Sequence, residues 1–140
     1  ASAYAGIPLT HRGLSRRVHL VTGHLQGDEP LNLPWGRLAD RDATLAIYMG
    51  LASLEAICGH LAAAGLDPAT PAAAIQDGTK PNQRRVLATL ATLPGAVAAA
   101  GLRAPVMVVI GQVVALATAI EWIQPQASEA VDAQIRSVHG

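Results

Sequence analysis

Two side chains near the start of the sequence could bind carboxylate groups. Arg12 ends the run GIPLTHR at residues 6–12, and His24 follows twelve positions later, at the end of a β-rich stretch. A guanidinium group binds a carboxylate through paired hydrogen bonds, and histidine adds a further donor. These residues therefore favour a ligand that carries several carboxylates. Two other interpretations stay open: His24 as a hydrogen-bonded structural histidine, and Arg12 as the partner of a nearby carboxylate at the domain edge.

The residue patterns of several enzyme classes are absent from the sequence. The five histidines form no ligand-spaced pair on a helix, and Cys58 belongs to no CxxC pair, so a metal site finds no support. The sequence also lacks the G-x-S-x-G turn of serine hydrolases, the G-x-x-x-x-G-K-[ST] loop of P-loop enzymes and the G-x-G-x-x-G turn of dinucleotide-binding domains. These absences disfavour a free-standing enzyme of any of these classes.

The composition is that of one well-packed domain. The chain has 140 residues, of which 51% are hydrophobic and 14% are charged, which disfavours a disordered tail. The formal net charge is +0, the aromatic content is 3% and Phe is absent. A non-specific nucleic-acid binder needs an excess of Lys and Arg, and a single-strand binder needs aromatic side chains for stacking. We therefore expect no nucleic-acid partner.

The single cysteine and the apolar runs bear on the compartment. The spacing of Cys58 from Leu54 and Leu61 places it on the apolar face of a helix, so we interpret it as a buried structural thiol rather than a reactive one. The longest apolar run, residues 104–110, is too short to span a membrane. We expect a cytoplasmic protein with no membrane partner. Because the sequence starts at Ala1 and not at Met, we also expect it to be a piece of a longer protein.

Apolar runs predict five strands, with helices between them. The runs cover residues 17–22, 43–48, 71–76, 83–87 and 106–110. A helical turn should cover residues 35–39, and a helix should follow residues 49–50 and end at Gly65. Another should cover residues 90–100, or begin near Leu93, since Pro94 is accepted only in a first turn. This alternation predicts the α/β class: a mixed or mostly parallel sheet of about five strands flanked by helices on both faces.

The pattern weakens after residue 111. Residues 130–138 have the periodicity of a helix that is half polar, and such a helix would pack on the domain or on a partner. We therefore divide the chain into a domain at residues 1–123 and a tail at residues 124–140.

Glycine follows three of the predicted strands, at Gly50, Gly78 and Gly111. In open α/β sheets, ligands bind beyond the carboxyl ends of the strands, and glycine lets a ligand approach the backbone closely. We therefore place a candidate crevice for a small ligand at these strand ends. Other interpretations stay open: glycines that only permit tight turns, Met49 as a filler of the core, and Asp77 as a cap of the segment that follows it.

Several blocks, collinear along the chain, resemble one family, the uroporphyrinogen-III C-methyltransferases, which include the methylase part of siroheme synthases. The resemblance extends from Ala1 to about Trp122. It is carried by residues 2–12 (SAYAGIPLTHR), 21–24 (VTGH), 48–51 (YMGL), 70–71 (TP), 74–79 (AIQDGT), 83–84 (QR), 111–114 (GQVV) and Trp122.

The resemblance implies one half of an enzyme. Members of the family look like two α/β domains that hold S-adenosyl-L-methionine between them and transfer methyl groups to C2 and C7 of uroporphyrinogen III. The product, precorrin-2, leads to siroheme and cobalamin. This chain resembles only the C-terminal domain, so the N-terminal domain that carries the catalytic groups would be a separate partner. We expect no catalytic residue in this chain, no activity of the chain alone, and a homodimer of the parent enzyme.

The resemblance also assigns roles to five residues. Met49 and Gly78 match positions whose backbone meets the cofactor, and Val106 matches a position near its adenine. Arg12 and His24 match positions that engage the propionate and acetate groups of the substrate. The reaction implied is a direct displacement at the sulfonium methyl by a pyrrole carbon, with S-adenosyl-L-homocysteine as the product. The alternative is a non-catalytic dimerisation or scaffold module derived from this fold.

Overall fold

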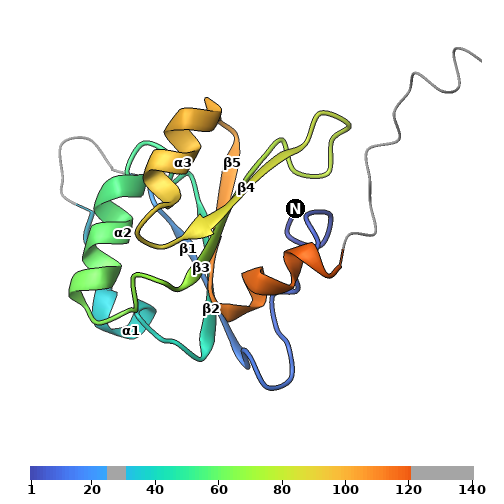
Figure 1. Cartoon of the computed structure of the whole chain (residues 1–140). Helices are drawn as coiled ribbons and strands as arrows, with labels where there is room; N and C mark the ends of the chain where they lie inside the picture. Colours follow the sequence, from blue (N-terminus) through green and yellow to red (C-terminus); the bar gives the residue numbers. More distant parts are fainter. Residues whose placement is uncertain (25–30, 121–140) are drawn as a thin grey trace, which may run out of the picture.

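Five strands form one mixed sheet in the computed structural model, which describes residues 1–24 and 31–120 (Figure 1). They are β1 (Arg17–Thr22), β2 (Ala43–Tyr48), β3 (Pro71–Gln76), β4 (Arg84–Thr89) and β5 (Val106–Ile110), in the order β1-β2-β5-β3-β4. The pair β1–β2 is parallel, and the pairs β2–β5, β5–β3 and β3–β4 are antiparallel. The predicted α/β fold is therefore confirmed, with the sheet in its mixed form.

Helices cover both faces of this sheet, as predicted. The helices α1 (Trp35–Leu38), α2 (Leu54–Ala63) and α3 (Leu93–Ala100) lie on one side, and the 3₁₀-helix η1 (Gln112–Thr118) lies on the other with the start of the chain (Figure 1). Helix α3 begins at Leu93 with Pro94 in its first turn, and it ends at Gly101, whose left-handed φ of 63° caps it. Helix α2 begins later than predicted. Met49 adopts a φ of 52°, which is not helical, so the helix cannot start directly after β2.

The central strands are buried on both faces because their apolar side chains alternate between two cores. On the side of α2 and α3, Ala72 and Ala74 pack with Val108. On the side of η1, Ala73 and Ile75 pack in a second core, together with Ala5, Ile7, Met107, Val109, Val113, Val114 and Ala117. Near-continuous apolar strands are what burial on both faces requires.

One arginine joins the start of the chain and η1 to the edge strand β4. Nη1 of Arg85, on β4, donates hydrogen bonds to the carbonyl oxygens of Ala5 at 2.6 Å and Ala117 at 3.3 Å. These bonds hold the start of the chain and η1 together.

The interpretation of Cys58 as a structural thiol agrees with its position in α2. Its side chain is 5% exposed and lies in the core between the helices and the sheet. Burial raises the pKa of the thiol to about 11, which keeps it protonated at neutral pH.

The ends of the parallel strands β1 and β2 touch each other through two glycines. The Gly23 amide donates to the Tyr48 carbonyl at 2.7 Å, and a Cβ atom at Gly23 would lie 2.7 Å from Cα of Gly50 and 2.9 Å from Cδ1 of Ile57. Only glycine fits such a contact. The contact holds His24, which follows Gly23, beside the segment that carries Met49.

No helix among residues 1–24 and 31–120 is long and apolar enough to cross a membrane. The predicted boundary at residue 123, the tail at residues 124–140 with its helix at 130–138, and Trp122 lie outside the described residues.

Alanine substitutions at two glycines, one inside the contact of Gly23 with Gly50 and one outside it, should have opposite effects on stability. Gly23→Ala should lower the free energy of unfolding by about 1–3 kcal/mol, because its Cβ overlaps Gly50 and Ile57. The control Gly59→Ala lies inside α2, where a Cβ would meet nothing within 4 Å, and should raise it by roughly 0.5–1 kcal/mol. Urea denaturation of both variants measures the difference. Equal stability of Gly23→Ala and the wild type would contradict the contact.

Candidate functional site

A cleft of about 920 Å³ opens where β2 and β3 end and β5 begins. It is lined by Ala1, by residues 48, 49, 51 and 52 around the end of β2, by residues 75 and 77–80 around the end of β3, and by residues 104–107 at the start of β5. Its size suits a small organic ligand, and most of the lining is apolar with a few polar groups, as in many cofactor sites. The cleft lies at two of the three strand ends where we expect a crevice, those of β2 and β3. The third expectation is wrong: because β5 runs antiparallel to its neighbours, Gly111 lies at the other end of the sheet, where its amide donates to the Pro71 carbonyl at 2.9 Å.

Non-glycine residues with a left-handed backbone conformation lie together at this cleft. Met49, Asp77 and Thr79 are the only non-glycine residues of residues 1–24 and 31–120 with a positive φ, at 52°, 50° and 73°. All three line the cleft. Such conformations cost free energy and often mark ligand sites, because the surrounding structure must hold them in place.

The backbone at Met49 and Gly78 is available to a ligand. Within the described part of the chain, neither residue uses its amide or carbonyl in a hydrogen bond. The Met49 side chain is 62% exposed, so the interpretation of Met49 as a core filler is wrong. At Gly78, a Cβ atom would lie 2.5 Å from Cβ of Ala1, so only glycine allows the chain start to pack here.

A row of apolar side chains crosses the sheet at the cleft. Met107 of β5 is the register partner of both Tyr48 and Ile75, and Val106 is the partner of Gln76. Tyr48 is half exposed, whereas Val106 and Met107 are buried in the sheet. The apolar residues of this row all line the cleft, so its wall is apolar between the backbone groups of Met49 and Gly78.

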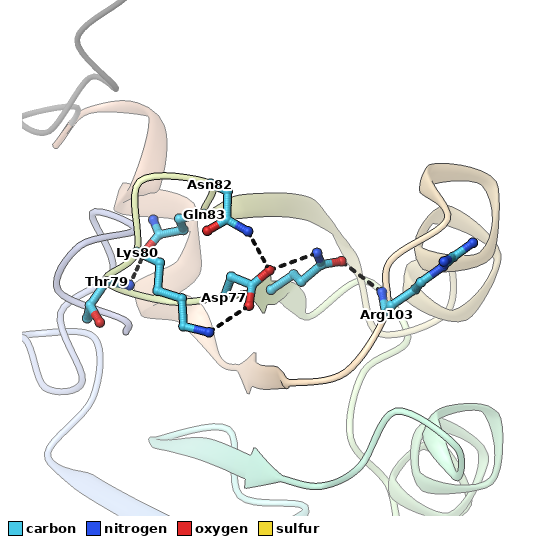
Figure 2. Close-up of polar contacts among 7 residues, drawn as sticks. Asp77, Thr79, Lys80, Asn82, Gln83 and Arg103 are labelled. Carbon is cyan, nitrogen blue, oxygen red and sulfur yellow. Dashed lines mark hydrogen bonds and ion pairs between the residues drawn. The ribbon is translucent and has the colours of Figure 1, made fainter. Parts of the chain in front are cut away.

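Asp77 carries the negative charge of the cleft and holds the turn that follows β3 (Figure 2). Its carboxylate accepts hydrogen bonds from Nε2 of Gln76 at 3.1 Å, Nζ of Lys80 at 3.2 Å and Nδ2 of Asn82 at 2.9 Å. The hydrogen bond from Gln76 and then the bond and charge of Lys80 lower the pKa of Asp77 below its ordinary value of 3.8. These contacts agree with the interpretation of Asp77 as a cap.

The cleft also contains charged residues that the sequence analysis does not single out as ligand contacts. Lys80 and Asp77 both line it and form an ion pair. The signal in the sequence is the run DGTKPN at residues 77–82, whose residue types are typical of a tight turn.

The predicted site residues fall into two groups in space. Met49, Gly78 and Val106 lie together in the cleft, and His24 lies close by, one residue after the contact between Gly23 and Gly50. His24 itself is exposed and does not line the cleft.

Arg12 lies apart from this group. It belongs to the turn closed by the bridge between His11 and Ser15, and the Ser15 hydroxyl accepts a hydrogen bond from the hydroxyl of Thr44 at 2.9 Å. Thr44 stands near the start of β2, so Arg12 is at the opposite end of the sheet from the cleft. It is exposed and forms no ion pair with any carboxylate among the described residues.

Among residues 1–24 and 31–120, no three or more His, Cys, Asp or Glu side chains are grouped so that they could hold a metal ion.

Comparison with protein families identifies the family of the chain. The model of the tetrapyrrole (corrin/porphyrin) methylases matches residues 1–94. The chain belongs to the tetrapyrrole methylases. The resemblance to the uroporphyrinogen-III C-methyltransferases and siroheme synthases is thereby confirmed, and individual relatives agree with it.

Two siroheme synthases illustrate how this tetrapyrrole methylase chain matches its relatives. The protein from Thiobacillus denitrificans is 47% identical over 127 residues, which cover 91% of this chain and 26% of that protein. The protein from Ectopseudomonas mendocina is 49% identical over 123 residues, which cover 88% of this chain and 26% of that protein. The chain thus spans about a quarter of the length of the curated relatives it matches.

Solved structures of tetrapyrrole methylases share the fold. The uroporphyrin-III C-methyl transferase from Thermus thermophilus, complexed with S-adenyl homocysteine, superposes with a TM-score of 0.66 at 32% identity, over 81% of this chain and 49% of that one. The cobalt precorrin-4 methyltransferase CbiF superposes with a TM-score of 0.71 at 23% identity, which supports the fold alone.

The hydrogen bonds of Asp77 predict a pH dependence of stability. Because they lower its pKa in the folded state, their contribution is fully present above 3.8 and is lost as the pH falls through the folded pKa. Asp77→Asn should therefore be less stable than the wild type at about pH 6, and the difference in stability should be smaller at about pH 3. Urea denaturation at both pH values measures this.

The control for this prediction is Asp42→Asn. The Asp42 side chain is exposed and accepts no hydrogen bond through its carboxylate within the described residues. A loss of stability in Asp77→Asn that is the same at both pH values would contradict the role of its charge.

Proposed function

We propose that this chain is the C-terminal domain of an S-adenosyl-L-methionine-dependent uroporphyrinogen-III C-methyltransferase that forms precorrin-2. In that enzyme it contributes one side of the cleft for cofactor and substrate. The observation that carries the proposal is the backbone of Met49 and Gly78, which has no hydrogen-bond partner among the described residues and lines an apolar cleft at the strand ends. The membership of the chain in the tetrapyrrole methylases supports it.

The residues of the cleft fit the chemistry of the cofactor. A nucleoside has a flat apolar face and polar edges, and this cleft combines the row of Tyr48, Met107 and Ile75 with the backbone groups of Met49 and Gly78. Val106 begins the strand beside them and would contact the adenine. The complex of the Thermus thermophilus relative with S-adenyl homocysteine supports the same ligand here.

The proposed reaction needs orientation more than acid–base chemistry from this chain. When bound, S-adenosyl-L-methionine supplies an electrophilic methyl group on a sulfonium. Methyl transfer to a pyrrole carbon of uroporphyrinogen III would leave the electron pair of the broken carbon–sulfur bond on the sulfur of S-adenosyl-L-homocysteine, and the methylated macrocycle would lose a proton. Met49, Gly78 and Val106 would hold the cofactor in line with the attacking carbon and exclude water. The catalytic groups belong, in this proposal, to the N-terminal domain.

The substrate carries propionate and acetate groups, for which we propose Arg12 and His24 as partners. His24 stands beside the segment that carries Met49, so it could reach a carboxylate of a substrate bound over the cleft. Arg12 lies at the other end of the sheet, so its role needs a surface outside this cleft. The proposed homodimer of the parent enzyme offers such a surface. The proposed location is the cytoplasm.

Binding of the product tests the proposal. The isolated chain should bind S-adenosyl-L-homocysteine weakly or not at all in a calorimetric titration, because it holds only one side of the cleft. The full-length protein that carries this chain should bind it with a Kd at least about 100-fold lower. If the full-length protein does not bind it, the proposal fails and the alternative of a non-catalytic scaffold module is favoured.

The role of Arg12 predicts a selective loss in the full-length enzyme. Arg12→Lys should lower kcat/KM for uroporphyrinogen III by roughly 10- to 100-fold, because lysine cannot form the bidentate pair, and should leave the affinity for S-adenosyl-L-homocysteine unchanged. The matched control is Arg16→Lys, at a neighbouring exposed arginine. Unchanged kinetics of Arg12→Lys with a lowered melting temperature would remove Arg12 from the substrate site.

A further inference from the structure

Two separate segments form the side of the cleft that is lined by Gly78 and Val106. One is the turn from Asp77 to Gln83 after β3, and the other is the segment that leads from α3 into β5. The two residues come from different segments, so a ligand that touches both requires a fixed spacing between them.

Gln76 joins these two segments through its side-chain amide (Figure 2). Its Oε1 accepts a hydrogen bond from the backbone amide of Arg103 at 2.7 Å, and its Nε2 donates to Oδ2 of Asp77 at 3.1 Å. Both ends of the amide are therefore used, which fixes its orientation.

Asp77 accepts or donates several of the hydrogen bonds that hold this turn. Besides Gln76, its carboxylate binds Lys80 and Asn82, its amide donates to the Pro105 carbonyl at 3.1 Å, and its carbonyl accepts from the Lys80 amide at 3.0 Å. The Asp77 side chain is only 14% exposed, whereas that of Lys80 is 59% exposed. The backbone bond to Pro105 thus adds a second link between the two segments.

The same contacts account for the unusual backbone of the turn. Asp77 and Thr79 both have positive φ, and the Thr79 amide donates to Oε1 of Gln83 at 2.8 Å. A chain segment with two such residues around Gly78 needs fixed side-chain partners to stay in one conformation. Asp77 and Gln83 supply these partners from within the turn.

We propose that Asp77 is a positioning residue for the cofactor: through Gln76 and Asn82, its carboxylate fixes Gly78 relative to Val106. This inference rests on the proposed function. Asp77 touches no reacting atom in this account, so its loss should weaken binding and leave the chemical step of the bound complex intact. The preorganised turn lowers the cost of ordering two segments when the ligand binds.

The test uses the full-length protein that carries this chain, with S-adenosyl-L-homocysteine as the probe. Asp77→Asn keeps a residue type that tolerates positive φ but removes the charge and places an amide among three donors. We expect the Kd for the probe and the KM for S-adenosyl-L-methionine to rise by about 5- to 30-fold, and kcat to stay within about twofold. The control Asp67→Asn changes a turn aspartate that does not line the cleft.

A double variant that exchanges the roles of residues 76 and 77 should restore binding of the probe. Gln76→Glu alone places two carboxylates together and should also raise the Kd. In the double variant Gln76→Glu with Asp77→Asn, the asparagine amide can donate to the glutamate, which can still accept from the Arg103 amide. We expect it to bind the probe more tightly than either single variant, a coupling that a general loss of stability does not produce.

Several outcomes would overturn the inference. It fails if Asp77→Asn binds the probe like the wild type, if only kcat falls, or if the double variant binds no better than the single ones. If Asp77→Asn does not fold, Asn82→Ala removes one exposed donor to the same carboxylate and must raise the Kd by about 2- to 5-fold; an unchanged Kd contradicts the inference. A wild-type protein that does not bind the probe overturns the proposed function instead.

Discussion

Burial of β3 and β5 on both faces is the constraint on which the rest of the structure depends. Both strands lie inside the sheet, and their side chains alternate between the core under α2 and α3 and the core under η1. Neither face of these strands is left for a ligand. Their exposed backbone is confined to the strand ends, so the cleft with Gly78 and Val106 forms there.

Close contacts between glycines and neighbouring backbone then hold the strand ends in place. Gly23 against Gly50 brings the ends of β1 and β2 together, and Gly78 against Ala1 brings the chain start to the end of β3. The positive φ of Met49, Asp77 and Thr79 is maintained at the same end of the sheet. The strained residues and the backbone groups that have no partner in the described part of the chain therefore lie together, as in a preorganised binding site.

Local sequence patterns predict the elements well but not the contacts between them. The strands at residues 17–22, 43–48, 71–76 and 106–110 match the structure because each is a short run that contains several apolar residues and has a clear end. The insertion of β5 between β2 and β3 in antiparallel direction could not be predicted, because both faces of these strands are apolar in any order. The late start of α2 depends on the backbone of Met49, which propensity does not reveal.

The sequence likewise predicts individual residues of the site but not the contacts between them. Met49, Gly78 and Val106 lie together in the cleft. The places of Met49 and Gly78 after strand ends suggest this, whereas Val106 begins β5 and is assigned by the resemblance alone. The separation of Arg12 depends on the turn at Ser15 and its bond to Thr44. The convergence of Gln76, Lys80 and Asn82 on Asp77 also depends on tertiary geometry.

A titration of the full-length protein with S-adenosyl-L-homocysteine, followed through its backbone amide resonances, shows whether the cofactor binds at the strand ends. We expect the largest changes in chemical shift at Met49, Gly78 and the start of β5, in proportion to the occupancy of one site. Changes confined to another surface, such as the groove of about 310 Å³ between α2 and α3 lined by Glu55 and Pro94, would contradict this expectation.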